Sequence, residues 1–295
     1  MEIGLNLSFA VKRWLKPAGL AEICKNELGV SKVQFTWDMI DPWWPEAERN
    51  ELAKEYRKEF SSRGIEISSS FGGVAAYSYS QLLSPTQLQR EISFEFFKRA
   101  IDLTRALGSN VMGTPVGGMS YEDSNNSEKR KELYYIALDY LRRLAAYGKE
   151  KGLSEILIEA TPLITEFPHS PEESLKMMRE LDGTTDIPIR LLIDWGHALF
   201  KPLLKKKADM ELWLKTCSPY VSCIHLQQTD GLWDRHWDFT KEGIVTGELI
   251  KKTLKNAKAE NIPQFLEVVT IFEDNDDEVL DRMKRSMKIL HEMLD

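Results

Sequence analysis

The chain alternates short runs rich in Val, Ile and Phe with longer amphipathic runs along its whole length. This alternation indicates βα units and a parallel sheet, because neighbouring parallel strands need a crossover connection between them. Eight such units within 295 residues are typical of a closed (β/α)8 barrel, or TIM barrel. We therefore predict an α/β fold with a single (β/α)8 barrel domain over residues 1–295. The predicted strands are residues 2–8, 32–37, 64–70, 110–115, 154–160, 189–195, 221–227 and 264–269.

Several of the intervening helices have recognisable ends. The segment Ser84-Pro85-Thr86-Gln87 has the form of a capping box with proline at the first helical position, and we expect this helix to continue to Gly108. Further helices are expected over residues 127–152, where a glycine ends the pattern, and over residues 276–294. The competing fold is a doubly wound open sheet. Against it, no G-x-G-x-x-G segment follows the first strand and no loop is a Walker A sequence.

Composition limits the partners of the protein. The net charge of −7 argues against a protein that coats nucleic acid, because nucleic-acid phosphates attract basic surfaces. Three cysteines without a C-x-x-C pair argue against a disulfide framework and a cysteine-based zinc site, and they fit a reducing cytoplasm. The sequence shows no signal peptide in residues 1–30 and no apolar run of about 18 residues. We expect a cytoplasmic homo-oligomer that binds a small molecule and neither nucleic acid nor a membrane.

Four consecutive predicted strands end in an acidic residue or a histidine, namely Glu159, Asp194, His225 and Glu267. Barrels of this kind carry their active sites at the C-terminal ends of the strands, and neighbouring strands lie roughly 5 Å apart. Taken singly, each carboxylate could be a helix cap or an ion-pair partner, and His225 could be a core histidine. Three carboxylates at the ends of apolar strands nevertheless need a balancing cation. We predict that the four residues bind one divalent ion, Mn²⁺ first and Co²⁺ or Mg²⁺ as alternatives.

The segment Asp194-Trp195-Gly196-His197 extends this pattern beyond the end of the sixth strand. We predict that Asp194 is an ion ligand rather than only a helix cap. We also predict that Gly196 permits a sharp turn, and that His197 returns to the same pocket. The alternative for His197 is a polar cap on the helix that follows.

Glu159, Asp194-x-x-His197, His225 and Glu267 together resemble the metal-site pattern of the xylose-isomerase-like barrel superfamily. Within it, the chain most resembles the sugar (phosphate) isomerase/epimerase group, which includes the tagatose and psicose 3-epimerases. The resemblance implies that Glu159 and Glu267 are both metal ligands and acid/base catalysts, and that His197 contacts a substrate oxygen or supports the metal. It implies a metal-dependent isomerase or epimerase that acts on a ketose or ketose phosphate. Carboxylate-mediated proton transfer through an enediolate is the expected chemistry.

The loop after the seventh strand departs from the pattern of the free-ketose epimerases. In those enzymes an Arg follows the seventh-strand His by six residues, whereas Arg235 and His236 lie ten and eleven residues after it in this chain. Glu166 is the nearest counterpart of a family glutamate that is displaced here. We expect Arg235, His236 and Glu166 to bind substrate and Trp37 to wall a sugar pocket, although Trp37 could instead pack in its loop or at a subunit interface. These departures argue against a free hexulose held in the same way. Candidate phosphate-binding groups, among them Arg235, His236 and the glycine-containing turns 68–73 and 113–118, favour a short ketose phosphate. Loop 72–85 resembles that of erythrulose-phosphate isomerases of the same superfamily.

Two other functions remain open at this point. An abasic-site DNA endonuclease shares the barrel and most of the ligands, and Asp234-x-His236 is similar to one of its elements. It needs three metal ions and extra histidines on earlier strands, where this chain has Trp37, Ser70 and Thr114. A metal-dependent dehydratase or lyase of the same superfamily would use the same site and the same enolate.

Overall fold

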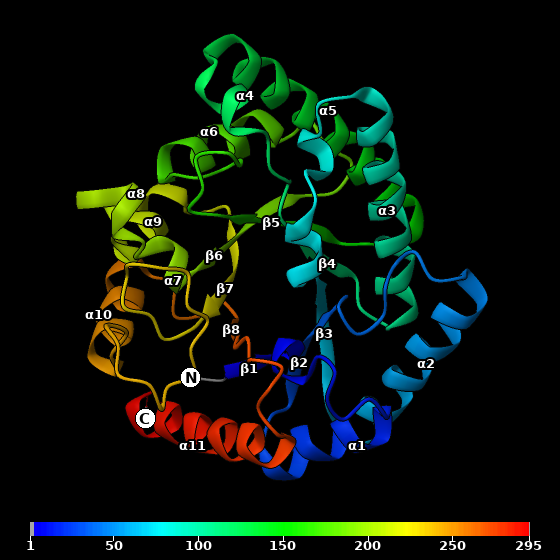
Figure 1. Ribbon diagram of the computed structural model, residues 1–295, viewed down its shortest axis with the longest axis vertical. Coiled ribbons are helices and arrows are strands. Elements are labelled where there is room, and N and C mark those ends of the chain that lie inside the picture. The colour runs from blue at the N-terminus through cyan, green and yellow to red at the C-terminus, as the bar shows by residue number, and fades with distance from the viewer. Residues whose placement is uncertain (1–2, 295) are drawn as a thin grey trace.

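The strands form a closed parallel barrel in chain order, with the helices around its outside (Figure 1). The structure is a computed structural model that describes residues 3–294. The first strand closes the barrel against the last, with Leu5 opposite Leu266. The predicted (β/α)8 barrel is therefore confirmed. The strands are β1 (Ile3–Asn6), β2 (Lys32–Thr36), β3 (Glu66–Phe71), β4 (Val111–Thr114), β5 (Glu155–Ala160), β6 (Ile189–Asp194), β7 (Val221–Leu226) and β8 (Gln264–Leu266).

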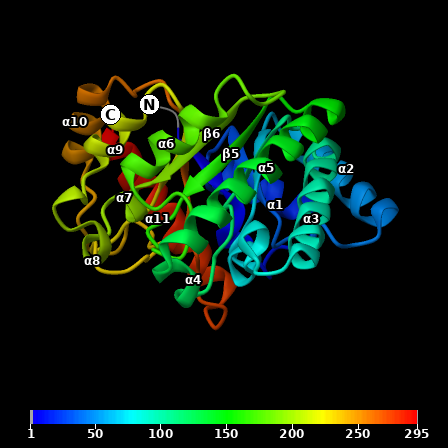
Figure 2. The ribbon, with the colours of Figure 1, turned by 90° about the horizontal axis from the view of Figure 1, so that it is seen from above.

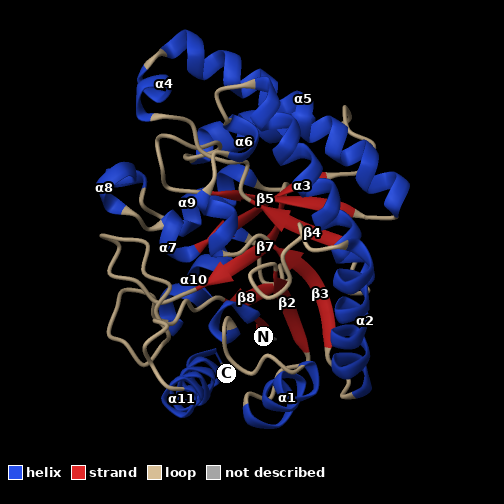
Figure 3. Cartoon of the chain, turned by 45° about the vertical axis from the view of Figure 1, so that its right-hand side comes forward, coloured by secondary structure: helices blue, strands red, loops and turns tan. Residues whose placement is uncertain are grey.

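The helices form an outer layer that surrounds the sheet, as two further views show (Figures 2 and 3). Each strand is followed by at least one of them, as the sequence predicts. None of the helices within residues 3–294 combines the length and the apolar character that a membrane span requires. The helices are α1 (Pro17–Glu22), α2 (Glu46–Ser62), α3 (Gln87–Ala106), α4 (Tyr121–Asn125), α5 (Ser127–Lys151), α6 (Pro171–Leu181), α7 (Trp195–Ala198), α8 (Lys201–Leu204), α9 (Met210–Cys217), α10 (Gly247–Ala257) and α11 (Asp276–Leu294).

Several element boundaries differ from the sequence prediction; β8, for example, ends at Leu266 rather than at residue 269. The capping box of α3 is formed by Thr86 and Gln89, not by the segment that begins at Ser84, because Thr86 Oγ1 accepts the Gln89 N–H at 3.2 Å and Gln89 Oε1 accepts the Thr86 N–H at 3.3 Å. The first strand ends at Asn6, whose side chain accepts the Ser8 N–H at 2.9 Å and starts a short 3-10 helix, η1 (Leu7–Ala10). Glu2, the first residue of that predicted strand, lies outside the described residues.

A small apolar plug fills the inside of the barrel, separate from the large core between the sheet and the helices. The side chain of Phe265 occupies space that a side chain at Gly4 would need, since an added Cβ there would lie 2.5 Å from the Phe265 ring. The plug closes the barrel interior to water. It forms the floor of the region at the C-terminal ends of the strands, where such barrels carry their active sites. It consists of Phe71, Leu157, Leu192, Cys223 and Phe265.

Candidate active site

The four predicted metal ligands lie directly above the apolar plug. Side chains on a strand alternate between its two faces, so a residue two positions after a plug residue also points into the barrel. The same spacing occurs at four consecutive strands and explains why the four polar side chains meet. The pairs of plug residue and ligand are Leu157 and Glu159, Leu192 and Asp194, Cys223 and His225, and Phe265 and Glu267.

The four side chains form one buried cluster, and each offers a ligand atom within 4.8 Å of the others. His225 Nδ1 lies 2.8 Å from Glu267 Oε2 and 3.2 Å from Glu159 Oε1. Glu159 Oε1 and Asp194 Oδ2 are buried without a hydrogen-bond partner among residues 3–294. Buried carboxylate oxygens without donors are costly, and a cation between them removes that cost. The residues present therefore fit a divalent ion bound by three carboxylates and one imidazole.

The electrostatics of the cluster also favour a bound positive charge. Burial raises the pKa of the Glu159 and Asp194 carboxyls above their usual range. Burial opposes protonation of His225, but the nearby Glu267 and Glu159 carboxylates outweigh it and raise the pKa of His225 to about 10. The pKa of Glu267 is lowered because His225 and His236 outweigh the effect of its burial. In the absence of a cation the cluster thus holds protons tightly. A divalent ion would replace these protons.

Two amide side chains that the sequence analysis did not single out, Asn6 at the end of β1 and Gln34 in β2, orient the ligands. Gln34 Oε1 accepts a hydrogen bond from His225 Nε2 at 2.6 Å, which leaves the lone pair of neutral His225 on Nδ1, facing the carboxylates. Asn6 Nδ2 donates to Gln34 Oε1 at 2.7 Å and to Glu267 Oε1 at 3.0 Å. Such outer contacts fix the tautomer and the direction of metal ligands. Their only sequence signal is an amide at an inward-facing position of an otherwise apolar strand.

The two oxygens of Asp194 have different roles. Oδ1 accepts the His197 N–H at 3.0 Å and so caps α7, while Oδ2 has no protein donor and faces the cluster. Oδ1 also accepts a hydrogen bond from Gln227 Nε2 at 2.7 Å. The helix-cap role and the ligand role, which the sequence presents as alternatives, are therefore compatible at one residue.

Gly196 lies where the chain turns from β6 directly into α7, and the structure shows why glycine stands there. Its backbone does not lie in the left-handed region that favours glycine. An added Cβ at Gly196 would instead lie 2.5 Å from both Cδ and Nε2 of Gln227, which is fully buried. Glycine is required here because the Gln227 carboxamide packs against this position.

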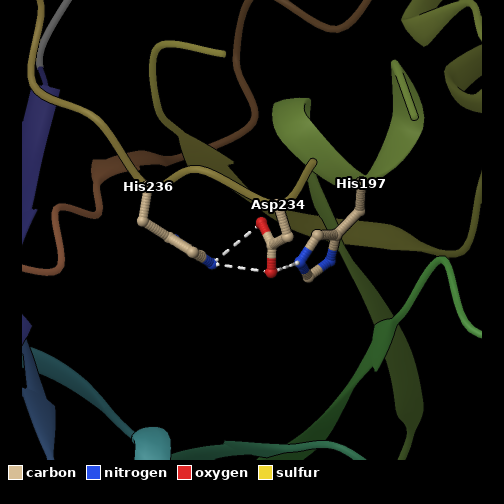
Figure 4. Close-up of side chains that lie close together, drawn as sticks. All are labelled: His197, Asp234 and His236. Atoms are coloured by element: carbon tan, nitrogen blue, oxygen red, sulfur yellow. Dashed lines mark hydrogen bonds and ion pairs between the residues drawn. The ribbon is translucent and has the colours of Figure 1, made fainter. Parts of the chain in front are cut away.

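His197 and His236 lie on either side of Asp234 (Figure 4). His197 Nε2 is 3.2 Å from Asp234 Oδ2, and His236 Nε2 is 3.1 Å from the same oxygen. Gln227 Nε2 donates to Asp234 Oδ1 at 3.1 Å, which connects this group to the Asp194 side of the cluster. The structure thus brings two of the predicted substrate-binding residues together, around an aspartate that the sequence analysis did not include among the site residues.

The other predicted substrate-binding residues have protein partners. Arg235 pairs with Asp230 through Nε at 3.0 Å and Nη2 at 2.6 Å. Glu166 Oε2 accepts a hydrogen bond from Thr161 Oγ1 at 2.6 Å, and burial raises the pKa of Glu166. The indole Nε1 of Trp37 donates to Ser70 Oγ at 2.9 Å. Arg235 would therefore have to leave its aspartate to reach a substrate.

A cavity of about 850 Å³ lies at the C-terminal end of the barrel. Its wall includes Ser8, two residues after Asn6, and Val269, two residues after Glu267, whereas the four cluster residues themselves are not part of its lining. This volume is within the usual range for small-molecule sites, and aromatic walls suit the apolar faces of sugars. The aromatic lining residues are Trp37, Trp43, Tyr79, Phe96 and Phe272.

The fold and the site together define a class, a TIM barrel with a buried carboxylate–histidine cluster at the end where such barrels carry their active sites. The sequence profile of the xylose isomerase-like TIM barrel family matches residues 25–293. The chain therefore belongs to this family.

Three relatives are informative. D-erythrulose 1-phosphate 3-epimerase from Brucella abortus (strain 2308) is 24% identical over 266 residues, which cover 88% of this chain and 84% of the relative. A crystal structure from Rhodospirillum rubrum ATCC 11170, of a protein provisionally assigned as a xylose isomerase, superimposes with a TM-score of 0.97 and 44% identity over 99% of both chains. D-psicose 3-epimerase from Clostridium cellulolyticum H10, solved with D-tagatose, has a TM-score of 0.73 at 12% identity over 100% of both chains.

The relatives whose names state an activity are mostly sugar epimerases, and epimerases are isomerases. The prediction of an isomerase is therefore confirmed at the level of this class. One structural neighbour, at 12% identity, is a probable 3-DHS dehydratase from Bacillus anthracis, and neither alternative function is favoured. In particular, the described residues form two groups suited to a metal ion, so the third ion of an abasic-site endonuclease has no such group within residues 3–294.

Proposed function

We propose that the protein is a metal-dependent sugar or sugar-phosphate isomerase or epimerase that acts on a ketose. The observation that carries this proposal is the pair of buried carboxylates, Glu159 and Glu267, on either side of His225 in one cation-binding cluster. A divalent ion held by Glu159, Asp194, His225 and Glu267 would supply Lewis acidity toward the ketose carbonyl and its neighbouring hydroxyl. Mn²⁺ is our first choice of ion, with Co²⁺ or Mg²⁺ as alternatives.

The two glutamates would perform the proton transfers. One carboxylate removes the proton from the carbon next to the carbonyl, and the substrate becomes an enediolate. The other carboxyl group returns a proton to the opposite face of that carbon, which inverts its configuration. Return of the proton to the former carbonyl carbon would instead give the aldose. Asn6 donates to Glu267 Oε1, and His225 Nδ1 lies 2.8 Å from Oε2, so the structure holds this carboxylate by both oxygens.

We further propose a short ketose phosphate as substrate and C3 as the carbon that is inverted. The name of the Brucella abortus relative supports both points, since that enzyme is a 3-epimerase of erythrulose 1-phosphate. The proposed substrate contacts remain His197, Arg235, His236, Glu166 and Trp37. The homo-oligomeric state and the cytoplasmic location stay predictions.

A substrate screen tests the proposal. The metal-loaded protein is incubated with C4–C6 ketoses and their phosphates in heavy water, and the products are identified by NMR. We expect one ketose phosphate to exchange a carbon-bound proton for deuterium and to appear as its 3-epimer. Loss of water from the substrate would instead establish a dehydratase, and the absence of turnover with every ketose would refute the proposal.

A further inference from the structure

The lining of the 850 Å³ cavity carries no positively charged side chain among the described residues. Its walls come from the segments after β8, β1, β2 and β3, which are neighbours in the barrel, and from the first half of α3. The charged side chains in this lining are those of Asp38 and Asp41. We propose that the cavity binds a neutral sugar ring, so that the protein also accepts ketoses linked to a second, uncharged sugar. Conversion of such ketoses rests on the proposed function, whereas binding of the ring does not.

The size and the charge of the cavity both exceed what a short ketose phosphate requires. A volume of 850 Å³ lies in the upper part of the range of about 300–1,000 Å³ that is usual for pockets that bury drug-sized ligands. A four-carbon ketose phosphate is much smaller than such a ligand. Its phosphate would also lie beside Asp38 and Asp41 without a counter-charge, which costs free energy. The cavity therefore suits an additional, uncharged group.

The aromatic wall of the cavity offers a stacking surface. The ring of Phe96 lies between two indoles, with centroid distances of 5.8 Å to Trp37 and 6.0 Å to Trp43. Trp37 is buried, whereas 41% of Trp43 is exposed. Phe96 and Trp37 thus support Trp43, whose indole remains open to a ligand. The apolar C–H faces of a pyranose ring pack well on such a surface.

The polar lining matches the hydroxyl groups of a neutral sugar. Asp38 Oδ2 accepts the Val74 N–H at 2.7 Å and Oδ1 accepts the Ala75 N–H at 3.0 Å, so backbone groups hold the carboxylate in place. Each of its oxygens can accept a further hydrogen bond, which a sugar hydroxyl can donate. The other polar side chains of the lining belong to serine, threonine and glutamine, which both donate and accept. Aromatic rings with such groups between them suit a ligand that has apolar faces and a hydroxylated edge.

A small organic cation is the competing occupant, because aromatic rings beside carboxylates attract positive charge. Two of the lining rings already have a cation of the protein over them. Arg99 Cζ lies 4.7 Å from the centre of the Trp43 ring, and Lys12 Nζ lies 4.2 Å from that of Phe272. The carboxylate of Asp38 also has its two backbone donors. A neutral ring is therefore favoured over a cation.

The cavity lies close enough to the cation cluster for one substrate to reach both. Val269, in the cavity wall, donates its N–H to the backbone oxygen of His236 at 3.2 Å. The imidazole of His236 lies with Nδ1 3.5 Å from Glu267 Oε2. Ser8, also in the wall, donates through Oγ to the backbone oxygen of Val268 at 3.0 Å. A ring attached to the far end of a ketose could thus occupy the cavity while the carbonyl lies at the cluster.

Methyl α-glucoside alone tests the ring site, because it has no carbonyl group and cannot be converted. It is titrated into the protein, and binding is followed by tryptophan fluorescence and calorimetry. We expect saturable binding to the wild type and binding weaker by at least roughly tenfold for Trp43→Ala. Trp44→Ala is the matched control, since Trp44 is the next residue and is 43% exposed but lies outside the lining, and it should bind as the wild type does. No saturable binding to the wild type, an equal loss in both variants, or binding of tetramethylammonium instead would overturn the proposal.

A second measurement needs the wild type alone. Isomaltulose is fructose with a glucose ring on the carbon farthest from the carbonyl group, so the two sugars differ by the ring. With the metal-loaded protein we expect kcat/KM for isomaltulose to be at least roughly tenfold higher than for fructose, mainly through a lower KM. Equal values, or no conversion of isomaltulose by a protein that converts a short ketose phosphate, would refute the inference.

These outcomes are separable from those of the substrate screen. A protein that binds methyl α-glucoside but converts no ketose would retain the ring site and lose the proposed function. A protein that converts a ketose phosphate but does not bind the glucoside would retain the proposed function and lose the ring site.

Discussion

Replacement of Gly196 by alanine tests how the end of β6 is held. The new Cβ would lie 2.5 Å from the Gln227 carboxamide, which must then move away from Asp194, Asp234 and the His236 N–H. Loss of the hydrogen bond to buried Asp194 costs about 2 kcal/mol, and loss of the other two costs about 1 kcal/mol each. Alanine in a helix recovers about 1 kcal/mol relative to glycine. The net destabilisation is therefore about 3 kcal/mol.

Thermal melts followed by circular dichroism measure this effect. At roughly 2 °C per kcal/mol for a chain of this size, Tm should fall by about 6 °C. Metal affinity should fall by roughly tenfold to a hundredfold, because Asp194 loses an orienting partner. Gly19→Ala is the control, since an added Cβ at this exposed position of α1 meets no atom within 4 Å, and it should leave Tm unchanged or slightly higher. If Gly196→Ala matched the wild type in both Tm and metal affinity, the assigned position of Gln227 would be wrong.

Four further predictions address the metal site, the chemistry and the cysteines. Chelation should lower Tm and abolish turnover, because the buried carboxylates then lack a cation; an equal Tm with and without chelator would argue against the site. Glu159→Gln and Glu267→Gln should fold and bind some metal while turnover falls at least about a hundredfold, and near-wild-type turnover of either variant would exclude that residue as a base. Gln34→Leu should weaken metal binding by roughly tenfold to a hundredfold with little change in the far-UV spectrum, as measured by calorimetric titration. Burial raises the pKa of the Cys24 and Cys217 thiols to about 12, so a thiol reagent at pH 8 should react with them only after denaturant is added.

The barrel could be predicted from the sequence because its signal is local and repeats eight times. Each strand is a short apolar run, and the order of strands and helices restricts the topology to very few choices. The cation cluster could be predicted for the same reason, since a ligand such as Glu159 follows an inward-facing plug residue by two positions. The structure confirms the fold and brings these four side chains together, while their roles in metal binding and catalysis stay predictions.

The supporting residues could not be predicted because their partners are distant in the sequence. Gln34 is separated from His225 by 191 residues, and nothing in its own strand marks it as the acceptor of that imidazole. The loop that contains Asp234 and Arg235 has no periodic pattern, so its conformation depends on contacts with Asp230 and Gln227. Arg235 was therefore predicted to bind substrate without any sign of its aspartate partner.

The seam between β1 and β8 has a kinetic consequence. Glu267, at the end of the last strand, receives its hydrogen bond from Asn6 in the first strand, so this contact forms only when the two ends of the sheet meet. A nascent chain that has not yet reached Glu267 has an incomplete cluster without its orienting amide. Ion capture would then follow ring closure during biosynthesis. In refolding experiments, added metal should slow unfolding of the finished barrel far more than it accelerates folding, since the ion's contacts are absent from the transition state.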